Sequence, residues 1–266
     1  MLEVKEICYE VNGRKIIKNV SLFAKRGQML AIVGANGAGK STLLSLLNAE
    51  NKPSSGVVTL DGRSMSDFDP LELAQKRATL AQSHHVNLAF SVEEIVMMGR
   101  YPHEKQQARE QDQRIVSETL RICGLKDFGE RSYLQLSGGE QQRVHLARVL
   151  AQIWDQPEAV LFLDEPVAGL DMRYQQQTLA IAKALCKKGM MVIAVLHDLN
   201  LVADYADRVL MLKDGRRWKY GTPIEVLNTL DIYHVFDVET EIKINPKTLS
   251  PLVLTKPIKI NHSELN

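Results

Sequence analysis

Eight consecutive residues near the start of the chain have the composition of a phosphate-binding loop. They read GANGAGKS and run from Gly34 to Ser41. Glycines let backbone N–H groups turn inward around a phosphate, and the start of a following helix adds partial positive charge. In this pattern Lys40 contacts the β and γ phosphates, and the Ser41 hydroxyl is a ligand for Mg²⁺. We expect a nucleoside triphosphate with Mg²⁺ to bind the loop residues Gly34, Ala35, Asn36, Gly37, Ala38, Gly39, Lys40, Ser41 and Thr42.

Two acidic residues follow an apolar run later in the chain. The run VLFL, at 160–163, is typical of a buried strand, and Asp164 and Glu165 come directly after it. At the end of such a strand Asp164 is expected to hold Mg²⁺, directly or through water. Glu165 would then orient or deprotonate an attacking water. Two solvated acids at a strand edge are the alternative, which the phosphate-binding loop disfavours.

A second helix start carries small residues that suit an anion. Ser137, Gly138 and Gly139 lie within LSGGE (136–140), at the beginning of a long helical pattern. Backbone N–H groups at a helix start attract phosphate, so the chain contains two such termini. One nucleotide can contact both only if they lie close in the fold, or if the second belongs to another subunit.

Strands alternating with helices must position these groups. The first forty residues predict strands with tight turns, including a hairpin at Asn12-Gly13. MLAIVGA (29–35) predicts a buried strand before the phosphate loop, and a helix follows the loop. Strand and helix patterns resume after about residue 155, which favours a mainly parallel sheet. From about residue 90 to residue 154 the pattern is nearly all helical, and a capping box at Ser91 begins one helix.

We therefore predict an α/β fold with a phosphate-loop NTPase core. The core and an N-terminal antiparallel β part are assigned to about 1–85 and 155–235, an inserted helical subdomain to 86–154, and a C-terminal extension to 236–266. Apolar residues make up 45% and charged residues 24%, which is ordinary for a globular protein. The formal charge of +1 disfavours a nucleic-acid partner.

These motifs together resemble the ATP-binding-cassette (ABC) ATPases over about residues 1–235. The resemblance implies that ATP and Mg²⁺ are the ligands. It also implies that Gln82 is the Q-loop glutamine, a catalytic group and Mg²⁺ ligand, and that His197 is the switch histidine that senses the γ-phosphate. Asp171 falls in the D-loop, beside the nucleotide. The family's adenine-stacking position is occupied by Val11, so the nearest aromatic, Tyr9, is the candidate for that role.

The resemblance further implies a head-to-tail homodimer, in which Ser137 and Gly139 act in trans on the partner's γ-phosphate. The segment SVEEIVMMGRYPH (91–103) is similar to importers of iron chelates, cobalamin and heme, and ARVLAQIW (147–154) is similar to bacterial hemin-import ATPases. We expect an ATP hydrolase that energises a bacterial heme importer.

Three other functions stay open at this point. A ferric siderophore or cobalamin importer is the first alternative, and a soluble ABC ATPase without a transport role is the second. The third is an ATP-gated interaction module without turnover, which the presence of Lys40, Glu165 and His197 disfavours.

The longest apolar runs are shorter than the ~20 residues of a membrane span, and the N-terminus lacks the apolar core of a signal peptide. A transporter would therefore use separate polytopic permease subunits and, indirectly, a periplasmic binding protein. The chain would be peripheral, on the cytoplasmic face of the bacterial inner membrane. In the family a groove near Gln82–Arg100 receives a short permease helix. Apolar candidates for that contact, or equally for packing inside the subdomain, are Leu88, Phe90, Val92, Met97 and Met98.

Three histidines lie in or near this region. His84, His85 and His103 invite assignment as heme ligands, but in this class the cargo passes through the permease. We expect surface or interface residues and no direct heme ligation.

Overall fold

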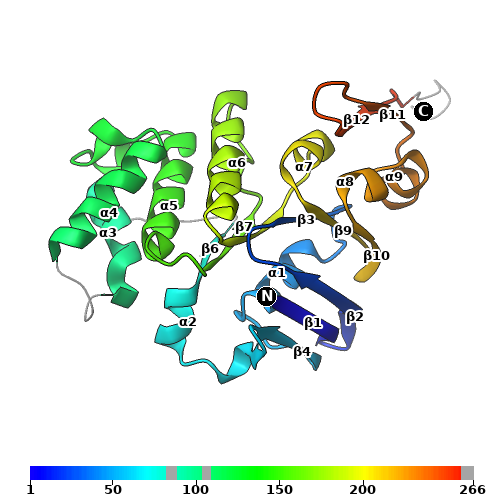
Figure 1. The fold of residues 1–266 in the computed structure, drawn as a ribbon, viewed down its shortest axis with the longest axis horizontal. Coiled ribbons are helices and arrows are strands. Elements are labelled where there is room, and N and C mark those ends of the chain that lie inside the picture. Colours follow the sequence, from blue (N-terminus) through cyan, green and yellow to red (C-terminus); the bar gives the residue numbers. More distant parts are fainter. Residues whose placement is uncertain (82–88, 104–108, 259–266) are drawn as a thin grey trace.

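The chain folds as two packed sheets with helices around them, a helical segment to one side and a separate two-stranded sheet near the C-terminus (Figure 1). The structure is a computed structural model that describes residues 1–81, 89–103 and 109–258. Within those ranges, no helix combines the length and apolar character needed to cross a membrane.

The N-terminal sheet is antiparallel and has the strand order β2-β1-β4-β5. Its first hairpin turns at Asn12 and Gly13, whose φ angles of 49° and 78° suit a tight two-residue turn. Val11 pairs with Arg14 across that turn, as the sequence predicts. The strands are β1 (Leu2–Val11), β2 (Arg14–Ala24), β4 (Ser55–Leu60) and β5 (Arg63–Ser64).

The second sheet has six strands in the order β10-β9-β3-β8-β7-β6. All pairs are parallel except β9 with β10, so the expected mainly parallel sheet is confirmed. Its strands are β3 (Met29–Gly34), β6 (Arg77–Leu80), β7 (Val160–Asp164), β8 (Met191–Val195), β9 (Arg208–Lys213) and β10 (Arg216–Gly221).

Both faces of this sheet are covered. Along β3, Met29 and Ala31 join one buried cluster, while Leu30 and Ile32 join the other, as the alternation of a strand requires. This explains why the strand is an unbroken apolar run. The helices of the core are α1 (Lys40–Leu47), α2 (Pro70–Lys76), α6 (Met172–Lys187), α7 (Leu199–Tyr205), α8 (Pro223–Val226) and α9 (Thr229–Phe236).

The segment between β6 and β7 is helical in its described part. The capping box at Ser91 is present, because Glu94 N–H donates to the Ser91 hydroxyl and Ser91 N–H donates to the Glu94 carboxylate. The helices are α3 (Val92–Met97), α4 (Arg109–Ile122) and α5 (Gly138–Ile153), with the 3₁₀ turns η2 (Met98–His103), η3 (Lys126–Phe128) and η4 (Tyr133–Gln135).

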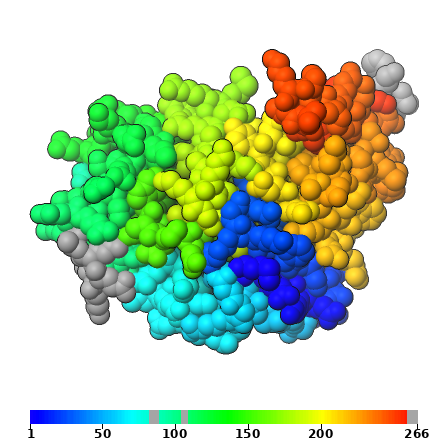
Figure 2. Space-filling view, viewed as in Figure 1, coloured from blue at the N-terminus to red at the C-terminus, as the bar shows by residue number. Residues whose placement is uncertain are grey.

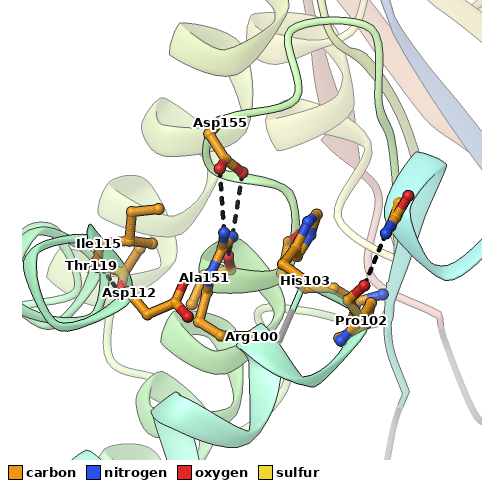
Figure 3. Close-up of polar contacts among 10 residues, drawn as sticks. Arg100, Pro102, His103, Asp112, Ile115, Thr119, Ala151 and Asp155 are labelled. Atoms are coloured by element: carbon orange, nitrogen blue, oxygen red, sulfur yellow. Dashed lines mark hydrogen bonds and ion pairs between the residues drawn. The ribbon is translucent and has the colours of Figure 1, made fainter. Parts of the chain in front are cut away.

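A buried arginine joins three of these elements. Arg100, 2% exposed, donates to the carboxylates of Asp112 on α4 at 2.8 Å and Asp155 at 3.1 Å. It also donates to the carbonyl oxygen of Ala151, in the last turn of α5, at 2.6 Å (Figure 3). The guanidinium thereby satisfies a helix-end carbonyl and two carboxylates at once, as its fork of donors allows.

His103 corrects one expectation. It was expected at the surface or an interface, but it is 1% exposed, and its Nε2 lies 2.8 Å from the carbonyl oxygen of Gln152 (Figure 3). Pro102 lies within the 3₁₀ turn η2, and that turn, packed on α5, directs the His103 ring inward. His84 and His85 lie outside the described residues.

The C-terminal extension forms a separate two-stranded sheet. β11 (Thr240–Ile244) and β12 (Pro251–Thr255) pair antiparallel, after helix α9. In Figure 1 this hairpin lies above α7 and α9, with β12 next to α7 and β11 next to α9.

Replacing the buried arginine should destabilise the protein strongly. Arg100→Ala leaves two partly buried carboxylates without this cation, so we expect a loss of about 3 kcal/mol in the free energy of unfolding, measured by urea denaturation. Arg114→Ala is the control, because Arg114 makes an exposed ion pair with Glu118 on the same helix and should cost at most ~0.5 kcal/mol. Equal losses for the two variants would contradict this account of Arg100.

Candidate functional site

The phosphate-binding loop connects β3 to α1 and needs its glycines. Helix α1 begins at Lys40 after Gly39, which has φ 96° in the left-handed region. A Cβ on Gly39 would lie 3.0 Å from the Ile17 side chain and 3.3 Å from the Ile16 carbonyl oxygen. Because glycine has no side chain to cap the helix, the first N–H groups of α1 face the loop and are suited to an anion.

Lys40 lies inside this loop. Its Nζ donates to the carbonyl oxygens of Gly34 and Ala35, both at 3.0 Å, and the residue is 6% exposed. Burial lowers the pKa of Lys40, and the nearby carboxylates of Glu165 and Asp164 partly offset that effect. The loop thus holds a desolvated cation where the sequence predicts phosphates.

Asp164 ends β7 and meets the start of α1. The Ser41 hydroxyl donates to Asp164 Oδ1 at 3.2 Å. Burial raises the pKa of Asp164, with the Ser41 hydrogen bond acting in the opposite direction and Glu165 adding to the rise. Two hard oxygen donors are therefore adjacent, and one is a carboxylate in a site that disfavours its charge. That donor set fits Mg²⁺, which is usually held by one or two protein oxygens together with substrate phosphates and water.

The described residues contain no cluster of three or more His, Cys, Asp or Glu suited to an all-protein metal site. The residues that would hold Mg²⁺ here are therefore Ser41 and Asp164, with the remaining ligands coming from the nucleotide and water. Gln82, the third expected ligand, lies outside the described residues.

Glu165 and His197 meet beside this group. Glu165 Oε1 lies 2.6 Å from His197 Nε2, and the histidine is the more exposed of the two. Glu165 has φ 50°, in the left-handed region, a conformation that costs a non-glycine residue about 1–2 kcal/mol. Its N–H donates to the Val195 carbonyl oxygen at 3.2 Å, which fixes the turn against the end of β8. Such strain at a polar, partly exposed contact is typical of a functional site.

These four side chains converge because the carboxyl ends of β3, β7 and β8 lie at one edge of the sheet. Strands β3, β8 and β7 are neighbours and parallel, so the residues after each strand are brought together. Lys40, the adjacent pair Asp164 and Glu165, and His197 lie in three segments far apart in the sequence; all four were predicted for the site, and the structure places them together.

The start of α5 is arranged differently from the start of α1. Ser137 caps α5, and its hydroxyl and N–H donate to Glu140 Oε2 at 2.7 and 2.8 Å. Both hydrogen bonds lower the pKa of Glu140, and the one from the hydroxyl has the larger effect. Ser137 and Gly138 are exposed, and a Cβ on Gly138 would meet no atom within 4 Å. A capping box read from S-G-G-E would have identified Glu140, which the sequence-based prediction of the site omitted.

The α5 start contacts the segment after Glu165 instead of the phosphate loop. Gln142 Nε2 donates to the Pro166 carbonyl oxygen at 2.9 Å, and Leu170 lies against Gly139. Asp171, expected beside the nucleotide, caps α6 by accepting from Tyr174 N–H at 3.0 Å. Among the described residues, no hydrogen bond joins Ser137, Gly138 or Gly139 to the cluster around Lys40. The sequence leaves open whether one chain or two supply the two helix starts that contact a nucleotide. The arrangement in which another subunit supplies the start of α5 therefore stays a prediction.

Tyr9 is half-buried and packs against the cluster of the N-terminal sheet, whereas Val11 is 40% exposed. A role of Tyr9 in adenine stacking stays a prediction.

A groove of about 980 Å³ lies in the helical segment. Its apolar lining comes from Phe90, Met97, Met98 and Tyr101, and its charged lining from Glu93, Glu94, Asp112, Glu130, Arg100 and Arg109. We call it the α3–α4 groove. Val92 is fully buried and packs inside the segment, so it does not line the groove, and Leu88 lies outside the described residues.

The family profile of ABC transporters matches residues 17–168. The chain belongs to the ABC transporter family. An ABC ATPase cassette binds ATP, and the assignment of the loop at Gly34–Thr42 as the site that binds it stays a prediction. The resemblance drawn from the motifs is confirmed, and so is the predicted fold class of an ABC ATPase.

Several relatives carry the name hemin import ATP-binding protein HmuV, among them proteins of Pseudomonas aeruginosa and Gloeobacter violaceus. The protein of Pseudomonas aeruginosa is 43% identical over 257 residues, which cover 96% of this chain and 100% of the relative. The protein of Gloeobacter violaceus is 44% identical over 257 residues, covering 96% of this chain and 94% of the relative.

Solved structures agree with the ABC fold. A dimeric ATP-binding cassette in a post-hydrolysis state, with ADP and phosphate bound, matches with a TM-score of 0.73 and 29% identity over 84% of this chain and 99% of that chain. An inward-facing transporter described as of the metal-chelate type matches with a TM-score of 0.79 over 97% of each chain, at 24% identity, and shows the fold alone.

Neutralising Asp164 should stabilise the chain without nucleotide. Its pKa is raised, so the folded state disfavours the carboxylate, and that cost is present above the raised pKa and vanishes as the pH falls through it. Asp164→Asn should therefore raise the unfolding temperature at neutral pH, while removing Mg²⁺-dependent turnover. Asp127→Asn, at an exposed site, is the control and should leave the unfolding temperature unchanged. A lower unfolding temperature for Asp164→Asn would contradict a folded state that disfavours this carboxylate.

Proposed function

We propose that this chain is the ATP-hydrolysing subunit of a bacterial ABC importer that carries heme. The observation that carries the catalytic part is the 2.6 Å contact between Glu165 and His197 beside the phosphate loop. The cargo rests on relatives named as hemin import proteins, 43% identical over nearly the whole chain. A ferric siderophore or cobalamin is the alternative cargo.

The site residues have separate roles in hydrolysis. The loop 34–42 binds the phosphates, and Lys40 neutralises charge on the β and γ groups. Ser41, Asp164 and the expected Gln82 hold Mg²⁺, which supplies charge neutralisation at the transferring phosphoryl group. Glu165 accepts a proton from a water molecule. The oxygen of that water attacks the γ-phosphorus, and the bond between the γ-phosphorus and the β–γ bridging oxygen breaks. His197, which is hydrogen-bonded to Glu165, orients that carboxylate and contacts the γ-phosphate.

A second copy of the chain completes the site. In this proposal Ser137, Gly138 and Gly139 of the partner subunit contact the γ-phosphate, with Asp171 near the interface. The exposure of Ser137 and Gly138 and the open space at Gly138 leave room for such a contact. For the Ser137 hydroxyl to donate to phosphate, its bond to Glu140 must open or be shared.

The permease partner is expected at the α3–α4 groove. Four carboxylates and two guanidinium groups line it together with apolar side chains, so a short segment with apolar and basic residues suits it best. Through this contact the chain would be held at the cytoplasmic face of the inner membrane, with a periplasmic binding protein acting only on the permease. Direct heme ligation is not proposed, since the His103 ring is buried.

The proposal is tested in proteoliposomes that contain the chain with its permease. ATP-dependent uptake of hemin is expected, and uptake of a ferric siderophore or of cobalamin is not. Glu165→Gln should keep ATP binding, lower turnover at least ~100-fold, and trap an ATP-bound dimer, because its amide cannot accept the water proton.

Glu158→Gln, at an exposed position away from the site, is the matched control and should behave as the unchanged chain. Normal turnover in Glu165→Gln would remove that residue from its role. Uptake of cobalamin or siderophore in place of hemin would overturn the cargo assignment alone.

A further inference from the structure

The C-terminal hairpin is attached to helix α7 through one asparagine side chain. Asn200 Nδ2 donates to the Val253 carbonyl oxygen at 3.1 Å, and Val253 N–H donates to Asn200 Oδ1 at 2.8 Å. A single amide group thus satisfies both backbone groups of a β12 residue, as a neighbouring strand would.

A second contact lies one helical turn further along. The Ser250 hydroxyl donates to Asp204 Oδ1 at 3.0 Å, and residues 200 and 204 share one face of α7. Val253 is 5% exposed and belongs to the same buried cluster as Leu201 and Val202 of this helix. The hairpin therefore holds α7 along its length, and in Figure 2 it lies against the yellow-to-orange surface that follows residue 200.

Helix α7 begins at Leu199, two residues after the proposed switch histidine, His197. Asp198 caps it, accepting from Asn200 N–H at 2.8 Å and from Leu201 N–H at 3.2 Å, so His197 is joined to Asn200 through a fixed turn. The helix has seven residues, too few to be stable alone, so its position depends on tertiary contacts.

We infer that Asn200 is a positioning residue for ATP hydrolysis: by fixing α7 to the C-terminal hairpin, it holds His197 against Glu165. This inference rests on the proposed function, since it assigns no chemistry to Asn200 itself. It gives the hairpin at 240–255 a role in the catalytic step, although no hydrogen bond among the described residues joins the hairpin to the phosphate loop or to Asp164.

The test is steady-state ATP hydrolysis by the full-length chain. Asn200→Ala should lower kcat about tenfold, the size expected when a catalytic group loses its orientation, while ATP affinity changes less than about twofold because the phosphate loop is on another element. Leu254→Ala is the matched control: Leu254 is the next residue on β12, lies on the opposite face of the hairpin and is 37% exposed. It should leave both kcat and affinity unchanged.

A double-mutant cycle separates positioning from loss of stability. If Asn200 acts through His197, then Asn200→Ala should lower kcat no further in a His197→Ala background. An additional tenfold loss in that background, or a parallel loss of ATP affinity, would overturn the inference. If Asn200→Ala folds poorly, Asn200→Asp is used for the test instead. It keeps the acceptor for Val253 N–H and replaces the donor with a charged carboxylate oxygen that faces the Val253 carbonyl oxygen. It should lower kcat about threefold, and a kcat equal to that of the unchanged chain would also overturn the inference.

The failure of this inference can be told from failure of the proposed function. If the unchanged chain hydrolyses ATP and Glu165→Gln does not, but Asn200→Ala matches the unchanged chain, only the role of Asn200 is lost. If Glu165→Gln hydrolyses ATP normally, the proposed function itself fails.

Discussion

The balance of charge around Lys40 constrains everything else in the site. One buried ammonium group faces the carboxylates of Asp164 and Glu165, so the protein presents a net negative charge to a polyanionic nucleotide. Backbone N–H groups at the start of α1 offset part of that repulsion, and a divalent cation bound beside Ser41 and Asp164 would offset more. Burial of Asp164, which would place its carboxylate beside the cation, disfavours the charged form and therefore raises its pKa.

The fold meets this constraint by placing strand ends together. Parallel strands β3, β8 and β7 put Lys40, His197 and the two acids at one edge, and both faces of the sheet are buried. In the helical segment, the contacts of Arg100 connect the α3–α4 groove to helix α5. Arg100 lines the α3–α4 groove and bonds to the end of α5, whose other end begins at Ser137. A partner in the groove would thus act on the helix that begins next to Ser137, a predicted phosphate contact.

The residue pattern was sufficient to predict the elements and residues that follow local rules. The turn at Asn12-Gly13, the buried run of β3 and the cap at Ser91 depend on neighbours in sequence, and each was confirmed. His103 was wrongly expected at the surface, because its burial depends on the packing of η2 against α5, which no local pattern encodes. The bond between Asn200 and Val253 spans 53 residues and was invisible for the same reason. Roles that need a nucleotide or a second copy, such as those of Ser137 and Asp171, stay predictions.

The central claim is that the γ-phosphate is held between the phosphate loop of one copy and the α5 start of another. It is tested most directly by mixing two inactive variants, Lys40→Ala and Ser137→Arg, and measuring ATP hydrolysis. In a mixed dimer one site combines an intact loop with an intact α5 start, so we predict recovery to about a quarter of the unchanged activity at equal mixing. If the mixture stays as inactive as either variant alone, both groups act within one chain and the account is wrong.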